Sequence, residues 1–167
     1  MNPSKGARGR PQESPEARDR GGALTVAVTV AAAVVLNLVI YGIGRAAGGG
    51  FRFTAAGQAA EVDAITVVGF TVLPLLTGMT LAAVLARIWP WAVPAGLAVA
   101  PVIALGTIPV MTIPADFDDA STITLALCHV ALVPVTAAGL LALRRRGGHV
   151  AARYGGGAGQ GQGSLDQ

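Results

Sequence analysis

The chain has 167 residues, of which 53% are hydrophobic and only 13% charged, and its formal net charge is +3. A soluble domain usually carries about 25% charged residues, so this composition excludes an ordinary soluble domain and indicates long membrane-spanning runs. The basic residues lie beside those runs, where we expect them to set orientation and contact anionic lipid, and we expect no nucleic-acid partner.

The first predicted element is a membrane span over residues 23–43. It follows a polar segment, residues 1–22, whose Pro, Gly, Ser and mixed charges predict a disordered tail. The span is apolar apart from Thr25, Thr29 and Asn37, and it is long enough to cross a hydrocarbon core of ~30 Å. A cleaved signal peptide has a shorter apolar region, so we expect this segment to be retained.

Three more apolar runs of span length follow. They cover residues 64–86, 91–113 and 122–143. The segments between the spans are a Gly-rich loop, a short turn and an acidic loop, at residues 44–63, 87–90 and 114–121. Residues 144–167 begin with three arginines and continue as a Gly- and Gln-rich tail, which we expect to be disordered. The predicted fold class is all-α, an integral-membrane four-helix bundle over residues 23–143 between two disordered tails.

The loop charges predict the orientation of this bundle. The loops on the side opposite the two termini carry only Arg45 and Arg52 as basic residues. The side of the termini carries ten: Lys5, Arg8, Arg10, Arg18, Arg20, Arg87, Arg144, Arg145, Arg146 and Arg153. Basic residues concentrate on the cytoplasmic side of membrane proteins. We therefore expect both termini in the cytoplasm, at a bacterial plasma membrane, with anionic lipid near Arg144, Arg145 and Arg146.

His129 is the outstanding polar residue, because ionisable side chains within a span are uncommon. Thr122, Ala126 and Thr136 share its helical face, and small residues mark helix contacts. This stripe predicts that His129 points into the bundle.

Four polar residues lie at a similar depth, six or seven residues from the loop end of each predicted span. They are Asn37, Thr71, Thr107 and His129. We expect them to form a polar layer in which Asn37 and His129 hydrogen-bond to each other. Two interpretations stay open: the layer holds the helices together, or it relays protons or binds a ligand. A metal site is not expected, because one histidine and the loop aspartates are a poor ligand set.

Interior prolines are expected to interrupt three of the spans. They are Pro74, then Pro94, Pro101 and Pro109, then Pro134. We favour simple kinks over a gated substrate path. In the acidic loop, Asp116, Asp118 and Asp119 either gather cations or belong to a turn in which Ser121 or Thr122 caps the fourth helix. We favour the cap.

Two stretches carry a family resemblance. NLVIYGIGRAAG at residues 37–48 and LALCHV at residues 125–130 resemble a family of small membrane proteins of GC-rich Gram-positive bacteria, defined only as a domain of unknown function. The resemblance covers residues 23–146 and implies four helices and no known activity. It implies that Asn37 and His129 are family features.

No catalytic motif is present. The chain lacks GxSxG, HExxH and P-loop patterns, and Cys128 as the single cysteine excludes an intramolecular disulfide. We therefore expect neither an enzyme nor a cofactor. The favoured function is a structural or interaction subunit that contacts the lipid bilayer and either a second copy or an unidentified membrane partner. The alternative is a small transporter or pore whose polar layer around His129 binds a solute or proton.

Overall fold

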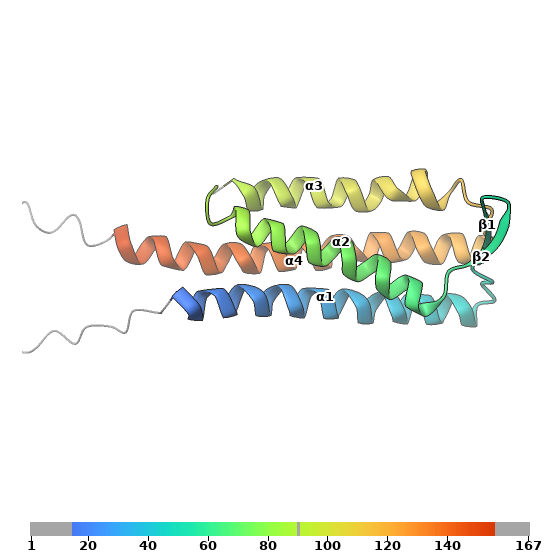
Figure 1. The fold of residues 1–167 in the computed structure, drawn as a ribbon, viewed down its shortest axis with the longest axis horizontal. Helices are drawn as coiled ribbons and strands as arrows, with labels where there is room; N and C mark the ends of the chain where they lie inside the picture. Colours follow the sequence, from blue (N-terminus) through green and yellow to red (C-terminus); the bar gives the residue numbers. More distant parts are fainter. Residues whose placement is uncertain (1–14, 90, 156–167) are drawn as a thin grey trace, which may run out of the picture.

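The computed structural model describes the chain over residues 15–89 and 91–155. It consists of long helices lying side by side, with a small β-hairpin at one end (Figure 1). In order along the chain, the elements are α1 (Pro15–Ala46), β1 (Arg52–Ala55), β2 (Gln58–Glu61), α2 (Ala64–Leu85), α3 (Ala92–Thr107), the π-helical turn η1 (Ile108–Thr112) and α4 (Asp119–Gly155). We call the end where α1 begins and α4 ends the termini end, and the opposite end the hairpin end.

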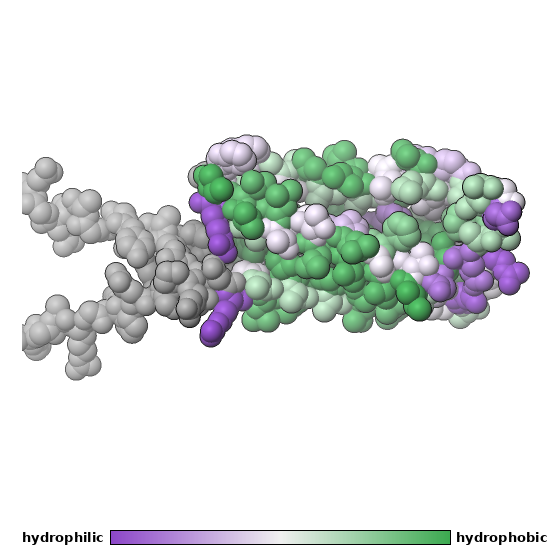
Figure 2. Space-filling model, in the orientation of Figure 1, coloured by the Kyte–Doolittle hydropathy of each residue, from purple (hydrophilic) through white to green (hydrophobic). Residues whose placement is uncertain are grey.

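Within the described residues, four helical segments are long and apolar enough to cross a membrane, as expected from the sequence. The qualifying segments are Arg20–Ala46, Ala64–Leu85, Ala92–Thr112 and Asp119–Arg145. On the face that Figure 2 shows, hydrophobic side chains form a broad belt across the middle of the bundle, and hydrophilic residues gather at its two ends. A belt of this kind is the surface that a hydrocarbon layer solvates best.

Two predicted boundaries were wrong. α1 begins at Pro15, inside the tail expected over residues 1–22, and α4 continues to Gly155, inside the tail expected over residues 144–167. Hydropathy marks where apolar side chains stop, whereas a helix continues while its backbone hydrogen bonds do. Ala and Arg near both ends are strong helix formers. The other tail residues lie outside the described part of the chain.

The segment expected as a loop over residues 44–63 holds the hairpin. Arg52 pairs with Glu61, and Ala55 pairs with Gln58. The two residues between the strands, Ala56 and Gly57, have φ values of 49° and 77°, the left-handed pair that a tight hairpin turn requires. Alanine seldom adopts that conformation, which is why the sequence carried no turn signal there.

The third span is divided. Pro94 lies in the first turn of α3, where a missing N–H costs little, and so does not interrupt the helix as expected. Near the hairpin end the α-helix gives way to η1 around Pro109, where the Ile113 N–H donates to the Ile108 carbonyl at 2.9 Å. Pro101 remains inside α3. The wide π-helical turn η1 therefore accommodates Pro109, and the span continues through it.

The bundle has an uneven interior. α1 packs against both α2 and α4, α3 packs mainly against α4, and α2 crosses the bundle obliquely (Figure 1). The apolar core lies towards the termini end and comprises Val26, Met79, Ala82, Val93 and Leu140. Towards the hairpin end the buried side chains are mostly polar or small: Asn37, Thr71, Thr112, Ser121, Thr124 and Cys128.

Candidate functional site: a buried polar seam and a tied hairpin

α1 and α4 approach each other through small residues. A Cβ added at Gly44 would overlap the Thr124 side chain, and one added at Gly139 would lie 2.5 Å from Thr29 Oγ1. Thr29 and Gly44 are as far apart along α1 as Thr124 and Gly139 are along α4. The two helices therefore run antiparallel in constant register. Close approach through small side chains is how helices associate where no water drives them together.

The buried face of α1 has a four-residue repeat. Thr25, Thr29, Ala33 and Asn37 are 8%, 7%, 0% and 3% exposed. Residues four apart lie on the same helical face, so these side chains form one continuous strip against α4. The opposing strip on α4 comprises Ser121, Thr124, Cys128 and Gly139. We call the two strips together the polar seam.

Asn37 lies where α1, α2 and α4 meet. Its Nδ2 donates to Thr71 Oγ1 at 2.9 Å, and the Thr71 hydroxyl donates to the Val67 carbonyl at 2.7 Å. Because the Thr71 proton is engaged, Thr71 Oγ1 faces the amide as an acceptor, which fixes the orientation of the Asn37 side chain. The Cys128 thiol contacts the Asn37 backbone carbonyl at 3.8 Å. Asn37 Oδ1 is buried and has no partner among the described residues.

The predicted hydrogen bond between Asn37 and His129 is wrong. His129 is half-buried, and its Nδ1 lies 2.7 Å from the carbonyl of Leu125 in its own helix. A carbonyl only accepts, so Nδ1 carries a proton and, in the neutral form of the ring, Nε2 presents a lone pair. The stripe through Thr122, Ala126 and Thr136 is half-buried as well. The deeply buried face passes through Cys128, one residue and about 100° away.

Thr107 lies near the level of His129. The Gly96 backbone packs against the Leu140 side chain, with 3.4 Å from an added Cβ to Leu140 Cδ1. Thr107 follows Gly96 along α3 by as many residues as His129 precedes Leu140 along α4. Because the two helices are antiparallel, Thr107 and His129 lie at a similar level. Thr107 is half-buried and donates to the Ala104 carbonyl at 2.8 Å. The structure thus joins Asn37 to Thr71, whereas Thr107 and His129 each bond to their own helix.

Asp118 ties the hairpin end together. Its Oδ1 accepts from the Ser121 N–H at 2.8 Å, and its Oδ2 accepts from Ser121 Oγ at 2.6 Å and from the Gly50 N–H at 3.0 Å. The bonds from Ser121 lower the pKa of Asp118 to about 2. Asp118 therefore caps α4, and the expectation that Ser121 or Thr122 would do so was wrong.

Asp116 holds the hairpin itself. It accepts from the Thr54 N–H and the Thr54 hydroxyl at 2.7 Å each, and these bonds lower its pKa. Two of the three aspartates of the acidic loop, Asp116 and Asp118, are thus hydrogen-bonded to the segment between α1 and α2. No sequence pattern indicates these contacts, because the hydrogen-bonded residues lie more than 60 residues apart along the chain.

Phe51 anchors the segment leading into the hairpin. Its side chain is fully buried, its ring centroid lies 4.6 Å from that of Tyr41, and its N–H donates to Ser121 Oγ at 2.8 Å. Its φ of 54° is left-handed, a conformation that bulky residues rarely adopt. Arg45, which lies 5.9 Å from the same ring, pairs with Glu61 at 3.1 Å. α1, α4 and the hairpin are therefore joined at one place.

The comparisons with known proteins identify a family and no activity. A family model described as a family of unknown function, DUF6069, matches residues 17–149 and so spans all four long helices. No curated protein and no solved structure matches the chain. The match covers most of the chain, and the protein belongs to the DUF6069 family of unknown function.

Proposed function

We propose that this protein is a multi-pass membrane protein with both termini in the cytoplasm, at a bacterial plasma membrane. The four apolar helices and the hydrophobic belt support insertion. The orientation is supported by the charge: Arg20, Arg87, Arg144 and Arg145 lie on described segments at the termini end, against Arg45 and Arg52 at the hairpin end.

Within the membrane we propose a structural or interaction subunit without catalysis. The observation that carries this proposal is the Asn37–Thr71 hydrogen bond, which joins two side chains that are each 3% exposed. Polar groups enclosed in this way hold helices together and are closed to a substrate. The hairpin contacts stiffen the same bundle at its end. A rigid bundle presents fixed outer surfaces to its surroundings.

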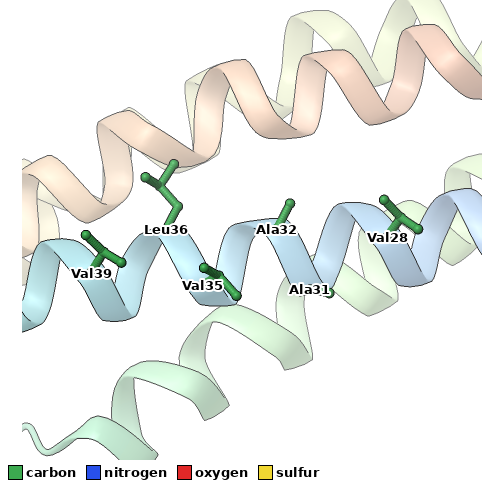
Figure 3. A pocket seen from close by; sticks show the side chains of 6 residues that line it. All are labelled: Val28, Ala31, Ala32, Val35, Leu36 and Val39. Atoms are coloured by element: carbon green, nitrogen blue, oxygen red, sulfur yellow. The ribbon is translucent and has the colours of Figure 1, made fainter.

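The outer face of α1 is one such surface. A shallow hollow runs along it, lined by six apolar residues of this helix (Figure 3): Val28, Ala31, Ala32, Val35, Leu36 and Val39. The face suits lipid chains, a helix of a membrane partner or a second copy of the chain. It carries no polar group that would select a soluble ligand.

A second candidate function is a small transporter or pore. The observation that favours it is the half-buried imidazole of His129, which lies within the apolar span of α4 with its Nδ1 2.7 Å from the Leu125 carbonyl. A titratable nitrogen inside a membrane bundle is suited to passing a proton. Four helices enclose little space, so this function requires several copies around a shared path.

One experiment separates the two functions. The protein is reconstituted into vesicles that carry a pH-sensitive dye, and the proton flux is compared with that of empty vesicles. An interaction subunit leaves the flux at the level of empty vesicles, both as wild type and as His129→Ala. A flux that wild type supports and His129→Ala abolishes would establish the transporter instead.

The topology is tested separately, in intact bacterial cells that express the protein. In a Cys128→Ser background, Gln58→Cys at the hairpin end and Ser164→Cys near the C-terminus are exposed in turn to a membrane-impermeant maleimide. We expect labelling of intact cells at position 58 and labelling at position 164 only after lysis. The reverse pattern would refute the proposed orientation.

A further inference from the structure

We propose that a single water molecule is bound where the polar seam meets α2. Its hydrogen-bond partners are Asn37 Oδ1, Thr71 Oγ1 and the Cys128 thiol. The inference rests on the enclosed Asn37–Thr71 pair that carries the proposed structural role. It adds to that role a ligand that completes the hydrogen bonding of the junction.

The side-chain oxygen of Asn37 is the group that requires a donor. Asn37 is 3% exposed, and its Oδ1 is buried without a hydrogen-bond partner among the described residues. The amide cannot be reversed to pair it, because the Thr71 hydroxyl donates to the Val67 carbonyl and therefore accepts from Nδ2. An unpaired buried oxygen costs free energy, and bound water is a common way in which proteins satisfy such a group.

Two groups of the same junction have bonding capacity left for this water. Thr71 Oγ1 accepts one hydrogen bond, from Asn37 Nδ2, and a hydroxyl oxygen has two lone pairs. Cys128 Sγ lies 3.8 Å from the Asn37 backbone carbonyl, a long contact for a weak donor. A water that donates to Asn37 Oδ1 and Thr71 Oγ1 and accepts from the thiol makes three hydrogen bonds, the typical number for buried water.

The enclosure of the junction favours water over a larger ligand. Thr71, Cys128 and Val67 are 3%, 5% and 7% exposed, and Ala33, one helical turn from Asn37 on the same strip, is 0% exposed. An organic molecule has no open surface through which to reach Oδ1. A metal ion is disfavoured too, because the described residues contain no group of three His, Cys, Asp or Glu side chains that could hold one.

The composition of the chain allows the site to be observed directly. The sequence contains one cysteine, three methionines and two asparagines, Asn2 and Asn37. In an Asn2→Gln background, carbon-13 labelling of Asn, Cys and Met therefore gives single asparagine and cysteine signals, from Asn37 and Cys128. Met79, which is 1% exposed in the apolar core, serves as the internal control. With the full-length protein in lipid vesicles, solid-state NMR measures how fast polarisation passes from water to each residue.

We expect polarisation from water to reach Asn37 Cγ and Cys128 Cβ sooner than the Met79 methyl group. Cys128→Val replaces the thiol with methyl groups, and transfer to Asn37 should then fall to the rate at Met79. The matched control is Leu127→Val, a change in the adjacent residue of α4, which is 51% exposed. This control should keep the transfer of the wild type.

Each other outcome contradicts a defined part of the proposal. Equally slow transfer to Asn37 and Met79 in the wild type would refute the water site and leave the structural role intact. Unchanged transfer in Cys128→Val, or an equal loss in Leu127→Val, would refute the position of the water beside Cys128. Equally fast transfer to Asn37, Cys128 and Met79 would show a bundle open to water, and would refute both the site and the closed structural role.

Discussion

The side-chain amide of Asn37 and the hydroxyl of Thr71 meet at 2.9 Å between α1 and α2, and both side chains are 3% exposed. This bond is the one place where the predicted polar layer joins two helices through side chains alone. Only one side of the Asn37 amide is satisfied, because Oδ1 has no partner among the described residues. The bond therefore positions α2 against α1, and the buried Oδ1 of Asn37 that lacks a hydrogen bond from another residue reduces the stability gained.

Removing this bond is predicted to destabilise the bundle modestly. Asn37→Ala and Thr71→Val should each lower the free energy of unfolding by about 1 kcal/mol, the range of hydrogen bonds between membrane helices. The double variant should lose less than the sum, because the two changes remove the same bond. Thermal unfolding in detergent measures all three.

The control for this cycle is Thr77→Val. Thr77 is an exposed residue of α2 whose hydroxyl donates to the Leu73 carbonyl of its own helix. It should leave the melting temperature close to that of wild type. Additive losses from Asn37→Ala and Thr71→Val would contradict the direct bond.

Gly44 is predicted to be the glycine of α1 that tolerates substitution least. Gly44→Ala places a methyl group in the Thr124 side chain and should cost about 1–3 kcal/mol by overpacking the polar seam. Gly42→Ala is the matched control, because nothing lies within 4 Å of a Cβ added there. It should be neutral or slightly stabilising, since alanine favours helix. Similar melting temperatures for the two variants would argue against the close approach of α1 and α4.

The sequence predicted the helices better than their rotation. Apolar runs of span length located all four, because length and hydropathy alone decide what crosses a hydrocarbon layer. A span that is apolar all round gives no periodic signal of its buried side. For that reason the stripe through His129 was wrongly predicted to be the inner face of α4. The face that packs on α1 passes through Cys128, about 100° away.

A usable signal for the buried face was present in α1. Thr25, Thr29 and Asn37 are the polar residues of that span, and with Ala33 they repeat every four residues. Such spacing of small residues marks a packed face. The hairpin had no comparable signal, because its turn uses Ala56 in a left-handed conformation and its aspartate partners are distant in sequence.

The hairpin end is predicted to loosen in acid. The pKa of Asp118 falls from 3.8 to about 2 on folding, through hydrogen bonds donated chiefly by Ser121. A lowered pKa in the folded state means that the stabilisation is fully present above about pH 4 and is lost as the pH falls through about 2. Asp118→Asn should remove much of this acid dependence and weaken the cap at neutral pH.

Hydrogen exchange of the Gly50 and Phe51 amides reads out this effect locally, because those N–H groups donate to Asp118 and Ser121. Protection of both amides should drop in Asp118→Asn. Asp119→Asn, the adjacent carboxylate, serves as the control and should keep it. Unchanged protection in both variants would show that the carboxylate of Asp118 does not hold the segment.

His129 is predicted to contribute little to the stability of the bundle. Its side chain is half-buried, and the hydrogen bond it makes is to Leu125 of its own helix, which would form in α4 without any other helix. His129→Ala should therefore shift the free energy of unfolding by no more than about 0.5 kcal/mol, whereas Asn37→Ala shifts it further. Thermal unfolding of the two variants side by side makes the comparison. If His129→Ala instead proves the more destabilising of the two, the imidazole supports contacts between helices and the prediction is wrong.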